Sequence, residues 1–252
     1  MKEGGAKFPM PSYLVSLRHV PELQGIHLNG GLRVGAGATM SDIAASAPIR
    51  EHYRALADGA EIVGSLQTMN MATVGGNVCN AAPSADTSPP LLALEATAVV
   101  AGEGGERETP IGEFWTGPGQ TVLAPGELVT EFRLPEPPPN TGSVYVRHTP
   151  RKQMDIAVVG VAVALTLGEG DRIERARIAL GAVAPTVIRA TKAEAALEGS
   201  AAGEALFSEA AETAASEASP ISDVRGSAEF RRHIVRVTVE RCLAEAARRA
   251  RS

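Results

Sequence analysis

Cysteine is scarce in this sequence, which contains two among 252 residues. Cys79 and Cys242 lie far apart and lack the close spacing of metal ligands, so the chain cannot form a disulfide framework or bind an iron–sulfur cluster by itself. Isolated thiols are typical of proteins in reducing compartments. We therefore expect a cytoplasmic protein without a metal site of its own.

Long apolar runs and clusters of basic residues are also missing. The longest apolar run, residues 156–167, is too short to cross a bilayer, and the first residues lack the apolar core of a signal peptide. The formal net charge is -5 with both signs interspersed, which argues against a nucleic-acid surface. We expect no membrane span and no nucleic-acid partner.

Hydrophobic residues make up 44% of the chain, which is enough for a sizeable core. A hairpin is predicted around the turn at residues 29–31, because Leu32, Val34 and Ala36 alternate with other residues after it. Residues 13–17 form a short apolar run that predicts another strand.

Two helices are predicted between this hairpin and the middle of the chain. Ser41 or Thr39 can cap a helix that starts at Asp42, and Pro48 is expected to end it. A second, amphipathic helix is predicted from Glu51, because its apolar residues recur at helical spacing: Tyr53, Leu56, Ala60 and Val63.

A linker is predicted at residues 137–142, where three prolines exclude both a helix and a central strand. We place a domain boundary there, between residues 1–138 and residues 143–250. The second part begins with predicted strands at residues 143–148, 156–167 and 172–180 and ends with helices at residues 191–198, 203–216 and 227–249. Helices on one face of an antiparallel sheet predict an α+β fold.

The most unusual stretch is residues 69–94. Its residues 72–77 combine a hydroxyl, two adjacent glycines and an amide, so the backbone can turn sharply and present N–H groups to phosphate oxygens. A polar segment that includes Asp86 follows, and then two prolines and an apolar run. This arrangement favours a ligand-binding loop. A short glycine motif alone is also compatible with an ordinary turn.

The whole phrase T-V-G-G-N-x-x-x-A-x-P-x-x-D, followed by proline and an apolar helix, closely resembles the FAD-binding subunit of the molybdenum hydroxylases. This family includes the medium subunit of carbon monoxide dehydrogenase-type enzymes and the flavin domain of xanthine dehydrogenase. Residues 32–36, 181–186 and 223–226 also match family phrases, so the resemblance covers nearly the whole chain. It implies an FAD-binding domain of the PCMH type, followed by a C-terminal domain of antiparallel sheet and helices.

The resemblance also implies which residues bind FAD. In the family, the threonine, glycines and asparagine hold the pyrophosphate and ribityl chain, an aspartate lies close to the cofactor, and a basic residue approaches the flavin. Carried over, the cofactor-binding residues are Ala72, Thr73, Gly75, Gly76, Asn77, Asp86, Val129 and Arg147. By contrast, we expect His52 to be a surface residue and Trp115 a core anchor.

The function that the resemblance implies is electron transfer. FAD would receive electrons from iron–sulfur clusters of a partner chain and pass them to an external acceptor, while substrate is oxidised elsewhere in the complex. The implied partners are a molybdopterin-containing large subunit and a two-iron two-sulfur small subunit. Two alternatives remain open: a self-contained FAD oxidoreductase, and a cofactor-free scaffold subunit.

The start of the chain differs from the family pattern. Family members begin with a strand–helix–strand unit that ends in a second glycine loop of the Ala-Gly-Gly-Thr kind, whereas this sequence opens at residues 1–5 with a phrase that matches the residues just after that loop. The first domain is therefore expected to be N-terminally truncated, by a misassigned start codon or by a real loss. We favour the start codon, and expect the chain as written to bind FAD weakly or not at all.

Overall fold

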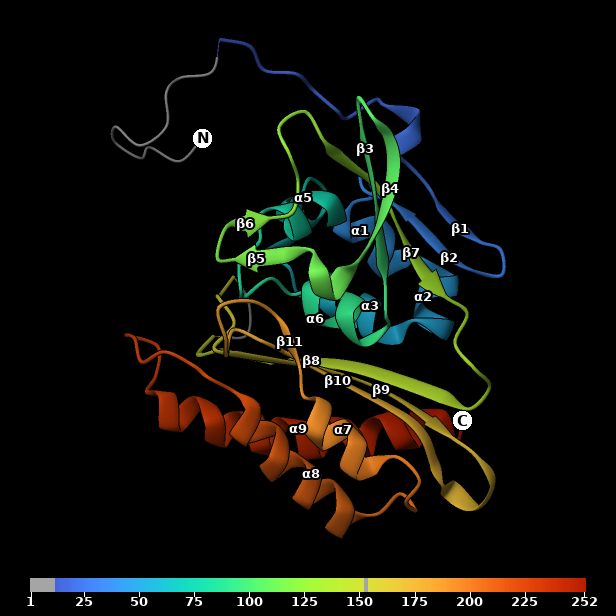
Figure 1. Cartoon of the computed structure of the whole chain (residues 1–252), viewed down its shortest axis with the longest axis vertical. Coiled ribbons are helices and arrows are strands. Elements are labelled where there is room, and N and C mark those ends of the chain that lie inside the picture. Colours follow the sequence, from blue (N-terminus) through green and yellow to red (C-terminus); the bar gives the residue numbers. More distant parts are fainter. Residues whose placement is uncertain (1–11, 152–153) are drawn as a thin grey trace.

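The computed structural model describes residues 12–151 and 154–252. Two sheets, each with helices on it, lie one above the other in Figure 1, and helix α6 lies between them. This arrangement confirms the predicted α+β class. The expectation for residues 1–5 lies outside the described residues.

The first sheet has five strands in the order β1-β2-β7-β3-β4, and all its neighbouring strands are antiparallel. The predicted hairpin is confirmed as β1 and β2, with Ile26 opposite Val34. The strands of this sheet are β1 (Ile26–Leu28), β2 (Gly31–Gly35), β3 (Thr97–Gly102), β4 (Gly105–Pro110) and β7 (Leu128–Pro135). A separate pair of strands consists of β5 (Trp115–Gly117) and β6 (Gln120–Thr121).

The strand predicted at residues 13–17 is wrong. These residues have no regular secondary structure, and the side chains of Tyr13, Leu14 and Val15 are 80–87% exposed. An apolar run forms a strand only when another strand pairs with it. The sequence of the run contains no information about such a partner.

The first part of the chain also contains six short helices: α1 (Met40–Ala45), α2 (Ala47–His52), α3 (Arg54–Ala60), α4 (Leu66–Met69), α5 (Val74–Cys79) and α6 (Ser88–Ala93). Thr39 caps α1, because its hydroxyl accepts a hydrogen bond from the Asp42 N–H and the Asp42 carboxylate accepts one from the Thr39 N–H. Pro48 lies in the first turn of α2 rather than ending α1, a position where its missing N–H costs no hydrogen bond.

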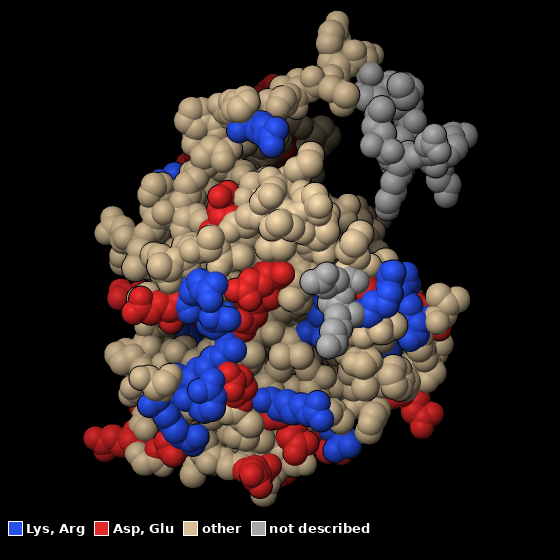
Figure 2. Space-filling model, turned by 180° about the vertical axis from the view of Figure 1, so that it is seen from behind, with Lys and Arg blue, Asp and Glu red and all other residues tan. Residues whose placement is uncertain are grey.

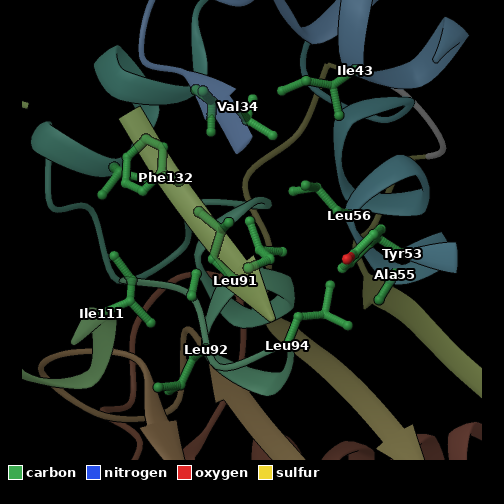
Figure 3. Close-up of a cluster of buried hydrophobic side chains, with 14 of the residues drawn as sticks. Val34, Ile43, Tyr53, Ala55, Leu56, Leu91, Leu92, Leu94, Ile111 and Phe132 are labelled. Atoms are coloured by element: carbon green, nitrogen blue, oxygen red, sulfur yellow. The ribbon is translucent and has the colours of Figure 1, made fainter. Parts of the chain in front are cut away.

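The helix predicted from Glu51 is broken at Tyr53, whose φ of -128° and ψ of 43° separate α2 from α3. This break turns the ring into the core, where its hydroxyl donates to the carbonyl of Pro135 at 3.1 Å. The surrounding core joins the sheet residues Val34 and Phe132 to Leu91 of α6 (Figure 3). Each of these side chains is completely shielded from solvent.

Trp115 is a core anchor, as predicted. Its ring is 8% exposed and packs edge-to-face against Phe114, while its indole N–H donates to the carbonyl of Val78 at 3.1 Å. The bond ties the β5–β6 pair to α5. His52 lies on the surface, also as predicted.

The second sheet has four antiparallel strands in the order β11-β10-β9-β8. Its strands are β8 (Thr141–His148), β9 (Val159–Leu167), β10 (Ile173–Gly181) and β11 (Ile188–Arg189). Its outer face is covered by α7 (Thr191–Leu197), α8 (Glu204–Glu217) and α9 (Ala228–Ala250) (Figure 1). The predicted strands and helices of this half are confirmed, apart from short β11, which was not predicted.

Residues of different size alternate along β9. Val161, Val163 and Leu165 belong to the core under α8 and α9, whereas Ala162 and Ala164 belong to the core of the first part. The second sheet is therefore buried on both faces. The division at residues 138 and 143 stays our proposal; in its support, β7 ends at Pro135 and β8 begins at Thr141.

Charges of both signs lie close together in space as well as in sequence. On the face shown in Figure 2, basic and acidic side chains alternate over the lower half, while the upper half carries few charges. Some of these charges form ion pairs within one helix, such as Arg54 with Asp58 in α3 and Arg248 with Glu245 in α9.

We expect Gly142→Ala to destabilise the chain, because a Cβ at Gly142 would overlap the carbonyl of Ala246 and lie 2.5 Å from the N atom of Ala250. These are backbone atoms of α9 and cannot move aside without shifting the helix. Overpacking of this kind costs about 3 kcal/mol, which urea denaturation can measure. The matched control is Gly104→Ala in an open turn, where nothing lies within 4 Å. Equal stability of the two variants would contradict the expected contact.

Candidate functional site

A cavity of about 800 Å³ opens where the end of β2 meets the start of α5. Four of the residues predicted to bind the cofactor line it: Thr73, Gly75, Gly76 and Val129. Its other walls include Arg18, Gln24, Thr39, Cys79 and Leu128. Pockets for small molecules and cofactors commonly have volumes of about 300–1,000 Å³.

Antiparallel backbone pairing holds the two sides of this cavity together. The N–H of Met40 donates to the carbonyl of Ala72, the N–H of Val74 to that of Ala38, and the N–H of Gly75 to that of Ala36, at 2.9–3.0 Å. A Cβ at Gly75 would lie 2.7 Å from both the Cβ and the carbonyl oxygen of Ala36. The first glycine of the motif is therefore required for packing.

The glycine motif begins a helix rather than forming the open loop that the sequence predicts. The hydroxyl of Thr73 caps α5 by accepting a hydrogen bond from the N–H of Gly76 at 3.1 Å. The N–H of Asn77 donates to the carbonyl of Thr73, and those of Val74 and Gly75 donate to residues after β2. The cap and the backbone pairing therefore already use these N–H groups, and their contact with phosphate stays a prediction.

Gly76 differs from Gly75 in its surroundings. A Cβ at Gly76 would meet only the Thr73 hydroxyl, at 3.1 Å, and the rest of that side is open to the cavity. A ligand can approach the backbone closely at this position, where any larger residue would project into the cavity. The surroundings of the second glycine thus fit a cofactor, while the first serves the fold.

Asn77 and Ala72 support the cavity without lining it. The side-chain oxygen of Asn77 accepts a hydrogen bond from the hydroxyl of Thr87 at 2.6 Å, which ties α5 to the start of α6. The carbonyl of Ala72 accepts the bond from Met40 described above. The structure thus brings six of the eight predicted residues into one region around α5 and β7.

The other two predicted residues, Asp86 and Arg147, bind each other. Arg147 lies on β8, and its Nη1 atom donates to Asp86 Oδ2 at 2.6 Å. Asp86 Oδ1 accepts a second bond from the hydroxyl of Tyr145 at 2.9 Å. Neither Asp86 nor Arg147 lines the cavity at Gly76; they join the loop after α5 to the second sheet.

Burial dominates the electrostatics of this pair. It raises the pKa of Asp86 to about 6, although the charge of Arg147 and the hydrogen bonds from Tyr145 and Arg147 lower it. Arg147 Nη2 is buried and has no hydrogen-bond partner among the described residues. A buried donor without a partner costs free energy, so an acceptor atom of a bound molecule would stabilise it.

Sequence reasoning did not single out Tyr145. The available signal was its position two residues before Arg147 in a predicted strand, which places both side chains on the same face of the sheet. Arg18 was missed too, because it follows the segment wrongly predicted as a strand.

The described residues contain no group of three or more His, Cys, Asp or Glu side chains placed to hold a metal ion. None of the described helices combines the length and the apolar character needed to cross a membrane.

Comparison with known proteins identifies the family. Residues 4–137 match the family described as the FAD binding domain in molybdopterin dehydrogenase, and residues 144–246 match the CO dehydrogenase flavoprotein C-terminal domain. The chain belongs to this family. The resemblance found in the sequence is thereby confirmed.

Named relatives match over most of their length. The xanthine dehydrogenase FAD-binding subunit of Escherichia coli O157:H7 is 32% identical over 93% of this chain and 81% of the relative. The carbon monoxide dehydrogenase medium chain of Hydrogenophaga pseudoflava is 31% identical over 94% of this chain and 82% of the relative. The chain is an FAD-binding subunit of this type of molybdenum hydroxylase, and thus an oxidoreductase subunit.

Solved structures agree with this fold. Carbon monoxide dehydrogenase from H. pseudoflava superposes with a TM-score of 0.87 at 32% identity, covering 91% of this chain and 79% of that one. Quinoline 2-oxidoreductase from Pseudomonas putida 86 gives a TM-score of 0.89 at 30% identity, covering 96% and 84%. The predicted domain types are therefore confirmed.

We expect FAD to protect Cys79 from alkylation, because this half-buried thiol lines the cavity. Burial raises its pKa to about 11, so iodoacetamide reacts slowly and is best applied near pH 9. Site-resolved mass spectrometry should show slower labelling of Cys79 when FAD is added. Fully buried Cys242, whose pKa burial raises to about 12, should stay unlabelled until the chain is unfolded. An equal labelling rate of Cys79 with and without FAD would contradict FAD binding in this cavity.

Proposed function

We propose that this chain is the electron-transfer subunit of a multi-subunit molybdenum hydroxylase, in which bound FAD accepts electrons from iron–sulfur clusters of a partner subunit and delivers them to an external acceptor. The observation that carries the proposal is the cavity at the start of α5, whose glycine-lined wall is open at Gly76. Membership of an FAD-binding family supplies the identity of the cofactor.

The residues around this cavity have distinct proposed roles. Thr73 and Gly76 would meet the pyrophosphate, since the hydroxyl and the open backbone lie side by side. Gly75 and Asn77 would hold α5 in place against β2 and α6. Val129 of β7 would supply an apolar wall.

Asp86 and Arg147 would act at the other end of the cofactor. Arg147 has a positive charge and a buried N–H group without a partner among the described residues, and a positive charge close to a flavin tunes its electronics. Asp86 would fix the orientation of the guanidinium through the 2.6 Å contact to Nη1. These assignments, with Ala72 as a backbone support, stay predictions.

The proposed partners are a molybdopterin-containing large subunit and a small subunit with two-iron two-sulfur clusters. Support comes from the names of the relatives, several of which are called a medium chain or subunit, as in carbon monoxide dehydrogenase and nicotine 6-hydroxylase. Such names describe one component of a larger enzyme. We also propose a cytoplasmic location, on the basis of the two free thiols.

We expect Gly76→Val to weaken FAD binding at least tenfold without unfolding the chain, because the branched side chain enters the cavity and its Cβ meets only the Thr73 hydroxyl among the described residues. FAD fluorescence titration measures the affinity, and circular dichroism checks the fold. Gly104→Val, in an open turn, is the matched control. His52→Ala is a second control on the surface. An unchanged flavin affinity for Gly76→Val would show that the cavity assignment is wrong.

A second test concerns the electron route. We expect an iron–sulfur partner subunit, reduced with dithionite and freed of excess reductant, to bleach the visible absorbance of the FAD-loaded chain. The control is the oxidised partner subunit, which should leave the absorbance unchanged. A chain that oxidises substrate without partners would instead be a self-contained oxidoreductase. A complex that assembles with a colourless chain would identify a scaffold subunit.

A further inference from the structure

Tyr145 connects the second sheet to the cofactor-binding half. The residue lies on β8 opposite Ala162, and its side chain is on the same face as that of Arg147, which is opposite Gly160. This face belongs to the core of the first part of the chain. Tyr145 is 4% exposed, and its hydroxyl donates to Asp86 at 2.9 Å.

Gly160 of β9 provides the space that the ring of Tyr145 occupies. A Cβ at Gly160 would lie 2.6 Å from the Tyr145 hydroxyl oxygen and 3.3 Å from two of its ring carbons. Gly160 has no positive φ, so its backbone does not require a glycine. The small residue at this position leaves space for the ring to reach Asp86.

Asp86 in turn is attached to the glycine motif. The next residue, Thr87, donates from both its hydroxyl and its N–H to the side-chain oxygen of Asn77, at 2.6 and 3.4 Å. Asn77 follows Gly76 in α5. The backbone of Asp86 packs against α3, where a Cβ at Gly59 would lie 2.6 Å from the Asp86 carbonyl oxygen. A shift of Asp86 therefore disturbs the residues next to the cavity.

We propose that Tyr145 is a positioning residue of the cofactor site: its hydroxyl keeps the Asp86 carboxylate charged and turned toward Arg147, and Gly160 leaves the space for it. The inference rests on the proposed function, because it assigns a role within the FAD site. It extends that function because Tyr145, a residue of the second sheet, then determines whether the carboxylate of Asp86 is charged.

The groups around Asp86 define its charge. Arg147 and Tyr145 contact it from β8. Asp58 of α3 accepts a bond from the Tyr145 N–H and is neutralised by Arg54 and Arg249. The thiol of Cys242 on α9 is also close enough to influence Tyr145. Among these groups, Arg147 and Tyr145 favour the charged carboxylate of Asp86, against the effect of burial.

The expected effect of Tyr145→Phe has a definite sign. A hydrogen bond to a carboxylate lowers its pKa, so removing the hydroxyl raises the pKa of Asp86 above its value of about 6. Hydrogen bonds to charged groups are strong enough for a shift of about one pH unit. FAD affinity should fall as Asp86 becomes protonated, because the neutral carboxyl holds Arg147 less firmly. The midpoint of the affinity profile should therefore move about one pH unit upward in the variant.

The test measures FAD affinity by fluorescence titration between about pH 5 and pH 8, which is about one pH unit on either side of the two expected midpoints. All chains carry His19→Gln, which removes the imidazole that lines the cavity. The matched control is Tyr53→Phe. Tyr53 is also a core residue and its hydroxyl also donates one hydrogen bond, but to the carbonyl of Pro135.

A second readout does not require FAD. The chemical shift of the Asp86 carboxyl carbon, followed by NMR through a pH titration, should report the same upward shift of the pKa in Tyr145→Phe and no shift in Tyr53→Phe. Gly160→Ala provides an independent variant, since its methyl group should displace the ring and raise the midpoint as well. In the Tyr145→Phe background, Gly160→Ala should have a smaller effect, because the closest atom has been removed.

The outcomes separate the two proposals. Upward shifts in Tyr145→Phe and Gly160→Ala, with none in Tyr53→Phe, support the role of Tyr145. If the parent chain binds FAD and the pH midpoint of FAD affinity is the same in Tyr145→Phe, the inference is overturned while the proposed function stands. An NMR shift of Asp86 without FAD binding at any pH would overturn the proposed function, and with it the role of Tyr145 in the cofactor site.

Discussion

The contact between α5 and the end of β2 is the constraint on which the site depends. Gly75 lies so close to Ala36 that one added carbon atom would separate them. The backbone pairing around this contact uses the donors of the first turn of α5, and the Thr73 cap uses the next one. The position of Gly76 and the shape of the cavity follow from this packing. What the motif offers to the cavity is thus its shape and the open side of Gly76 rather than free N–H groups.

The second constraint is the close approach of the two sheets through α6. Small residues on the inner face of the second sheet permit this approach: Gly160, Ala162, Ala164, Ala179 and Gly181. A Cβ at Gly181 would lie 2.8 Å from the ring of Pro89. The polar segment that follows the glycine motif and contains Asp86 is therefore enclosed between the sheets. Its burial gives Asp86 its raised pKa and makes its two hydrogen-bond donors important.

Local patterns in the sequence predicted much of the fold. The turn at residues 29–31 and the alternation after it predicted the first hairpin, and the strands and helices after the linker also agree with the structure. Errors occurred where distant residues decide the conformation. The helix breaks at Tyr53, whose hydroxyl bonds to the distant Pro135, and the segment at residues 13–17 has no neighbouring strand among the described residues.

The site was predictable to the extent that a motif identifies its family. The resemblance identified the family and its cofactor, and the structure gathers Thr73, Gly75, Gly76 and Val129 around one cavity. No spacing in the sequence relates Asp86 to Tyr145, which is 59 positions away along the chain. Their contact depends on the packing of two sheets, and such packing has no local signature.

The shared inner core of the two sheets has a consequence for unfolding. Ala162, Ala164 and Ala179 belong to the same core as Leu91, so separating the sheets exposes the interior of both halves. The chain is therefore expected to lose its structure as one cooperative unit. Amide hydrogens of β9 and α6 would then exchange with solvent through the same global opening, rather than through independent opening of each half.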